Sequence, residues 1–288
     1  MLKKCLKYDL QAIGRIWWIL AVIMMGAALI AGLGFRALLQ VTFDPNSEGF
    51  IVFLAIIGFL AGILSIFGMI AGLTVSVILV YWRTYTNFYT DEGYLTFTLP
   101  VKRSTLYLSK VLTAAIVETA TLLIFFLGVG LILLIAPPTT AGGGIISPVV
   151  YTSIGELFSG AWGAVGGWLI VWIIALIPLL FLTQLYASGL VFLCMTIGSV
   201  IAKKHKLLAA IGIYYAINAV ISFVSQFISM FLSAGVMSII LTAVNSGMLI
   251  GGITITAVIL IAGLIIACLA IVLHFTTVHL LEKKLNLA

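Results

Sequence analysis

The residues that would do chemistry in this chain are few and widely spaced. His274 and His279 lie five positions apart with no glutamate between them, so the HExxH spacing of a zinc peptidase is absent. The sequence also has no GxSxG motif and no GxxxxGK[ST] phosphate loop. Cys5, Cys194 and Cys268 form no CxxC pair, which predicts neither a disulfide framework nor a thiolate metal site. The sequence therefore predicts no enzyme, no metal and no bound cofactor in this chain.

Glu118 is the only carboxylate deep inside an apolar segment. A carboxylate in lipid is costly, and by default it marks an ion or proton path. The alternative is a protonated or hydrogen-bonded structural glutamate. The sequence leaves both interpretations open.

A second polar feature is a stripe in the apolar segment at 207–233. Its members recur at steps of four, three, four and four, which places them on one face of a helix; they are Asn218, Ser222, Ser225, Ser229 and Ser233, with Gln226 beside them. Unpaired polar groups are costly in lipid, so this face is not expected to meet lipid tails. It either hydrogen-bonds to neighbouring helices or lines a water-accessible translocation pathway.

The elements that must position these residues are membrane-spanning helices. Of the 288 residues, 64% are hydrophobic and only 8% are charged, whereas about a quarter of a soluble domain is charged. Six apolar runs reach the roughly 20 residues that a span needs; they lie at about 16–39, 50–81, 105–135, 163–198, 207–233 and 248–279. We predict an all-α polytopic protein in the lipid bilayer, with no nucleic-acid partner.

The basic residues predict the orientation. All but one of the 14 Lys and Arg residues lie before the first span, in or beside the second and fourth linkers, or at the C-terminal end. The exception, Arg36, lies at the other end of the first span. This alternation follows the positive-inside rule if both termini are cytoplasmic and the spans cross the cell membrane.

Residues 2–15 carry an amphipathic pattern, because Leu2, Leu6, Leu10 and Ile13 recur at helical spacing with the charges elsewhere. The pattern predicts a short helix on the inner membrane surface. The alternative is a frayed basic tail.

The second span contains two glycine pairs four residues apart, Gly58 with Gly62 and Gly68 with Gly72. Ser65 and Ser76 extend a face of small residues, which lets helix backbones approach closely in lipid. We predict helix packing within the subunit; a subunit interface or a pathway wall is the alternative.

Charge gathers in one unusual stretch, DEGYLTFTLPVKRSTLYLSK at 91–110, between the second and third spans. Asp91 suits a helix start, Pro100 ends the apolar segment, and Ser104 suits the start of the next helix. The stretch is too short to span a membrane, and its apolar side chains predict a docked partner; they are Tyr94, Leu95, Phe97 and Leu99. The alternative is a helix lying on lipid.

The segment DEGYLTFTLPVKRSTLYLSKVL resembles the second cytoplasmic loop of bacterial ABC-2-type transporter permeases. The resemblance implies a single permease domain over 1–288, with a coupling helix in the loop at about 88–104 that docks on a separate ATPase. The implied docking residues are Asp91, Glu92, Tyr94, Leu95, Phe97, Thr98 and Leu99. ATP and Mg²⁺ would bind to that ATPase, and a second permease copy or a paralogue would complete an exporter of an antimicrobial peptide, lipid or drug.

One departure from this family is visible, because the linker expected between the last two spans has only about 14 residues and leaves no room for a sizeable outer domain. Two other classes stay open. A six-span binding subunit of an uptake system would show a defined pocket and tight ligand binding without ATP. A membrane enzyme would cluster His, Asp or Glu at one depth, where this chain has only Glu118.

Overall fold

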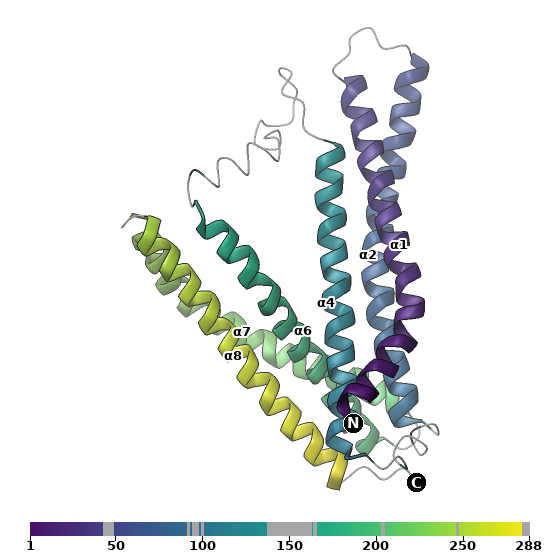
Figure 1. Ribbon diagram of the computed structural model, residues 1–288, viewed down its shortest axis with the longest axis vertical. Helices are drawn as coiled ribbons and strands as arrows, with labels where there is room; N and C mark the ends of the chain where they lie inside the picture. Colours follow the sequence, from purple (N-terminus) through teal and green to yellow (C-terminus); the bar gives the residue numbers. More distant parts are fainter. Residues whose placement is uncertain are drawn as a thin grey trace. The chain divides into compact units, whose positions relative to one another are not determined.

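The protein is helical throughout the part of the chain that the computed structural model describes (Figure 1). The described residues are 1–42, 49–90, 93, 98, 101–136, 163, 166–202, 205–245 and 248–283, and no strand occurs among them. Six long helices follow one another: α1 (Leu2–Thr42), α2 (Gly49–Tyr89), α4 (Arg103–Ile135), α6 (Trp168–Ile201), α7 (Lys206–Asn245) and α8 (Met248–Lys283).

All six helices are long and apolar enough to cross a membrane. The candidate spans are Leu2–Leu38, Gly49–Tyr89, Arg103–Ile135, Ile170–Ile201, Lys206–Phe227 and Gly251–Glu282. The chain is therefore a multi-pass membrane protein, and the prediction of an all-α fold with six apolar helices is confirmed to that extent.

Every helix except α6 is longer than the sequence predicted. α1 is continuous from Leu2 to Thr42, with no break near residue 16. Its 41 residues measure about 60 Å, twice the thickness of a bilayer core. Arg15 and Arg36 enclose an uncharged stretch of about 30 Å, which matches that core. The first turns of α1 therefore extend beyond the hydrocarbon.

The expected linker at 234–247 is largely helical instead. α7 continues to Asn245 and α8 begins at Met248, which leaves only residues 246 and 247 between the two helices. No proline interrupts residues 234–245, so nothing in the sequence forces the helix to end earlier. The connection between the last two helices is therefore even shorter than the sequence predicted, and the predicted linker already left no room for a sizeable outer domain.

The chain divides into two compact units. The first unit contains Met1–Gln11, Val80–Ile116 and Val165–Ala288, and the second contains Ala12–Leu79 and Val117–Ala164. Helices α1, α2 and α4 contribute residues to both. The units are therefore not two successive segments of the chain.

In the second unit, α1 and α2 approach closely and run in opposite directions. Gly34 on α1 faces Gly58 on α2, and Ala31 faces Gly62. A Cβ atom added at Gly34 would lie 2.0 Å from the Gly58 carbonyl oxygen, so this contact excludes any side chain. Backbones this close gain packing energy that lipid tails cannot supply.

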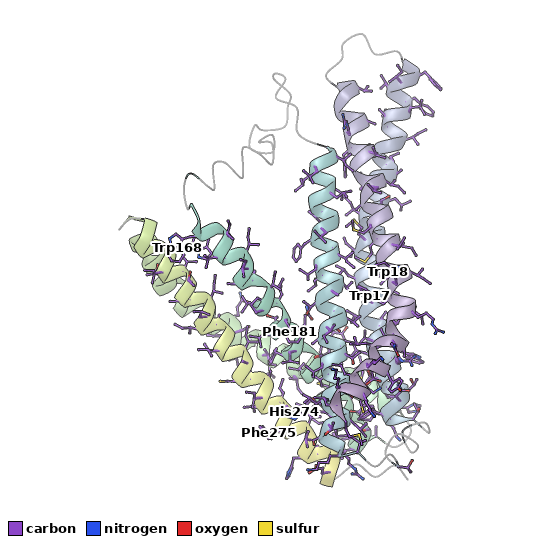
Figure 2. The ribbon with its side chains drawn as sticks, in the orientation of Figure 1. Trp17, Trp18, Trp168, Phe181, His274 and Phe275 are labelled. Carbon is purple, nitrogen blue, oxygen red and sulfur yellow. The ribbon has the colours of Figure 1, made fainter. Side chains whose placement is uncertain are left out.

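A hydroxyl group links three helices of the second unit. Thr121 of α4 accepts a hydrogen bond from the Trp17 indole of α1 at 2.8 Å and lies 2.9 Å from the Ser76 hydroxyl of α2. Its own proton goes to the Val117 carbonyl at 2.7 Å, so Ser76 must donate to Thr121. Figure 2 shows Trp17 beside Trp18 on α1. Trp17 thus serves helix packing, while Trp18 is exposed.

In the first unit, α6 packs on α7 and α8. Trp168 and Trp172 of α6 meet Gly252 and Thr256 of α8, one helical turn apart on each helix. The later residue on α6 contacts the later residue on α8, so α6 and α8 run parallel (Figure 2). The Trp172 indole donates to the Thr256 hydroxyl at 3.2 Å. The missing side chain of Gly252 lets the Trp168 ring lie against the α8 backbone.

Candidate functional site

The polar stripe lies on α7, and its described side chains are exposed or half-buried. Ser222, Ser225 and Gln226 are exposed, and Asn218 is half-buried. Asn218 donates to the Tyr214 carbonyl at 3.0 Å and Ser225 to the Ser222 carbonyl at 2.9 Å, both on α7 itself. The side chains of Ser229 and Ser233 lie outside the described residues. For Ser222 and Ser225, packing against other helices of the first unit does not explain the stripe.

Most of the linker that resembles a coupling helix lies outside the described residues; this applies to Asp91, Glu92, Tyr94, Leu95, Phe97, Leu99 and Pro100. Thr98 is exposed in a turn, and Gly93 is buried directly after α2. The Gly93 amide donates to the Thr90 carbonyl at 2.8 Å. A Cβ atom at Gly93 would lie 2.6 Å from the Phe88 carbonyl oxygen, so the turn out of α2 requires glycine.

The residue that ends α2 is fixed to α6. Tyr89 is 2% exposed, and its hydroxyl lies 2.7 Å from the hydroxyl of Thr196. Thr196 donates its own proton to the Phe192 carbonyl at 2.8 Å, so Tyr89 is the donor to Thr196. Tyr85 stacks on Tyr89 with ring centroids 6.1 Å apart. The linker therefore starts from an anchored residue.

The residue that begins α4 is fixed to α8. The Arg103 guanidinium donates from Nη1 to the Leu281 carbonyl at 2.9 Å. Leu281 lies in the last turn of α8, where carbonyl groups lack partners within the helix. Arg103 therefore caps the end of α8 and is more than a surface charge.

A second contact holds the start of α4 to the N-terminal turns of α1. Lys110 forms an ion pair with Asp9, and the Ser109 hydroxyl lies 3.2 Å from the other carboxylate oxygen. Both side chains of the pair are largely buried, with 12% of Lys110 and 17% of Asp9 exposed. Lys110 is therefore bound to protein and is not a free charge at the membrane surface.

Aromatic rings fill the space between these anchors. Tyr107 of α4 lies 6.2 Å from Phe192 of α6 and 5.3 Å from His274 of α8, measured between ring centroids. His274 is half-buried on α8 beside Phe275 (Figure 2), whereas His279 is exposed. Among the residues that the structure describes, no three His, Cys, Asp or Glu side chains gather as metal ligands would. His274 is a packing residue in this arrangement.

Glu118 belongs to the second unit and is 6% exposed. It lies on α4 one helical turn before Thr121, the hydroxyl that joins α1, α2 and α4. Burial keeps the carboxylate away from lipid, as both interpretations of this residue require. The stripe on α7 belongs to the first unit, whereas Glu118 belongs to the second.

The four glycines of α2 differ in their surroundings. Gly58 and Gly62 face α1, and a Cβ atom at Gly72 would lie 2.6 Å from the Met24 side chain of α1. Around Gly68 a Cβ atom would meet nothing within 4 Å. Gly68 therefore has no packing role among the described residues, unlike the other three.

Comparisons with protein-family models, with curated proteins and with solved structures found no match. Sequence reasoning missed Tyr89, Thr196 and the Arg103 cap. One signal was available, because Tyr81, Tyr85 and Tyr89 recur every four residues and so mark one aromatic face at the end of α2.

Proposed function

We propose that this chain is the membrane subunit of an ATP-driven exporter that works with a separate ATPase subunit. The observation that carries the proposal is the linker between α2 and α4. Residues 91–112 resemble the ATPase-docking loop of ABC-2-type permeases. The two flanks of this linker are tied to different helices, Tyr89 to α6 and Arg103 to α8. A connecting loop without a mechanical role needs no such anchors.

The anchors suggest how a push on the linker reaches the spans. The apolar side chains at 94–99 occupy a groove of the ATPase, and ATP-driven closure of two such subunits displaces the linker. Tyr89 passes the displacement to α6, and Arg103 passes it to α8. Both helices pack on α7, which carries the polar stripe. The stripe is then the moving wall of the pathway for an amphipathic or hydrophobic substrate, such as an antimicrobial peptide, lipid or drug.

The remaining parts of the proposed assembly follow from the same resemblance. A second copy or a paralogue supplies the other half of the pathway, and ATP with Mg²⁺ binds to the ATPase. The distribution of the basic residues supports a cytoplasmic location of both termini, with the spans in the cell membrane. The first turns of α1 lie at the inner surface.

Docking is tested by replacing the apolar anchors of the linker. Tyr94→Ala and Leu95→Ala should each weaken recovery of the ATPase with the detergent-purified chain about 30-fold, because buried anchors carry most of an interface's energy. Lys102→Ala is the matched control, since an exposed flanking charge is screened by salt. If both anchor variants recover the ATPase as the unmodified chain does, the linker is not a coupling helix and lies on lipid instead.

The pathway is tested by labelling the stripe on α7. In a background without Cys5, Cys194 and Cys268, Ser222→Cys and Ser225→Cys should react with a small water-soluble thiol reagent about tenfold faster than Ile221→Cys, because thiolates form in water. ATP should change the rates at the two serine positions. Equal rates at all three positions would assign the stripe to contact with lipid or with another subunit.

A further inference from the structure

The N-terminal turns of α1 present basic side chains on one side only. Lys3, Lys4 and Lys7 are exposed, and we call these three residues the lysine face. Tyr8 lies beside them and is 69% exposed. On the opposite side of the helix Cys5, Leu6, Asp9 and Leu10 are partly sheltered. The apolar side of this segment thus faces protein, whereas a helix lying freely on a bilayer would turn it into the lipid.

The lysine face contains no acid to neutralise it. Asp9 is the only acidic residue among the first 43 residues. Its carboxylate is bound by Lys110 and lies next to Ser109, both on α4. None of the three lysines forms an ion pair with the acidic residues that the structure describes. Figure 1 shows the N-terminus beside the lower part of α4, where this contact lies.

The same helix then becomes a membrane span. At 1.5 Å per residue, Lys7 lies about 12 Å and Lys3 about 18 Å along α1 from Arg15, where the uncharged stretch begins. The three lysines therefore lie no more than about 18 Å from the point where α1 enters the hydrocarbon. Basic residues that border a span are attracted to anionic headgroups by the negative surface potential of the leaflet.

We infer that the lysine face of Lys3, Lys4 and Lys7 binds the headgroups of anionic phospholipids, and that the Asp9–Lys110 ion pair orients it for this purpose. The pair has two effects. It fixes the rotation of the first turns of α1, so that the lysines point away from α4. It also keeps the Asp9 carboxylate from neutralising them. This inference does not depend on the proposed transport function.

The inference is tested on the full chain in neutral detergent by titration with short-chain phosphatidylglycerol. An environment-sensitive fluorophore on Tyr8→Cys, in the background without native cysteines, reports binding next to the lysine face. Each Lys→Gln change at positions 3, 4 and 7 should weaken binding about fivefold, and the triple variant about a hundredfold. The control variant removes the same charge elsewhere through Arg83→Gln, Lys102→Gln and Lys206→Gln, and it should weaken binding much less than the lysine triple variant does, because these three residues lie on or directly before separate helices and share no face.

The orienting role of the ion pair is tested at equal net charge. Lys110→Gln releases Asp9 and should weaken phosphatidylglycerol binding, whereas Lys102→Gln should not. Adding Asp9→Asn to Lys110→Gln should restore only part of the affinity, because the freed carboxylate is then removed but the pair no longer fixes the rotation of the first turns.

Two outcomes would overturn the inference. One is equal affinity of the lysine triple variant and its control. The other is a response to polyglutamate as strong as the response to the lipid, which would assign the lysine face to an acidic protein partner.

Discussion

Alanine at position 34 should destabilise the packing of α1 against α2 by about 3 kcal/mol, at the upper end of what overpacking costs. The added methyl group would lie 2.0 Å from the oxygen and 2.8 Å from the carbon of the Gly58 carbonyl. Both are backbone atoms in the middle of α2, so no side-chain rotation relieves the clash. The two helices must separate, and the close contact that holds them in lipid is lost.

Thermal unfolding of the purified chain in detergent measures this loss. Gly68→Ala is the matched control, because a Cβ atom there meets nothing within 4 Å. It should leave stability unchanged or raise it slightly, since alanine favours a helix more than glycine does. Gly72→Ala should fall between the two, because the flexible Met24 side chain can move aside. Equal melting temperatures for Gly34→Ala and Gly68→Ala would show that α1 and α2 do not meet at Gly34.

The six helices were predictable because lipid leaves the backbone few choices. Hydrogen bonds within a helix satisfy every backbone group without water, so a long apolar run is helical almost regardless of its side chains. The ends were less predictable. Arg15 marks where the hydrocarbon portion of α1 begins, yet the helix itself starts at Leu2. Charge limits the depth of a span in the membrane, but it does not end a helix.

Contacts between helices were only half predictable. The small residues of α2 indicated a packing face, and Gly58 and Gly62 do face α1. Their partners, Gly34 and Ala31, could not be deduced, because a pattern on one helix does not identify the helix that it meets. The polar contacts show the same limit. Ser76 was assigned to a face of small residues, whereas its hydroxyl binds Thr121, which lies 45 positions later in the chain.

The site was the least predictable part. The resemblance at 91–112 drew attention to the linker itself, most of which lies outside the described residues. The contacts that give the linker its anchors come from its flanks. Lys102 and Arg103 are adjacent cations in the sequence, and a charge count treats them alike. Only the three-dimensional arrangement places the end of α8 next to Arg103.

Arg103→Gln should therefore destabilise the first unit by about 0.5–1.5 kcal/mol, the net worth of a typical hydrogen bond, because Arg103 is itself exposed and water replaces part of the contact. The change leaves the Leu281 carbonyl without the guanidinium at the end of α8. Lys102→Gln removes the same charge one residue earlier and should stay within about 0.5 kcal/mol, as surface substitutions do. Thermal unfolding of the two variants side by side measures the difference.

Under the proposed function, the same pair of variants also tests whether a displacement of the linker acts on the spans. Arg103→Gln leaves the apolar anchors at 94–99 intact, so the ATPase should still be recovered with the chain. Because the link from the linker to α8 is weakened, stimulation of the ATPase should fall, and the effect of ATP on labelling at Ser222→Cys should shrink. Lys102→Gln should preserve both. If Arg103→Gln and Lys102→Gln have the same melting temperature and the same ATPase stimulation, the guanidinium does not hold α8. A displacement of the linker would then reach the spans through Tyr89 and α6 alone.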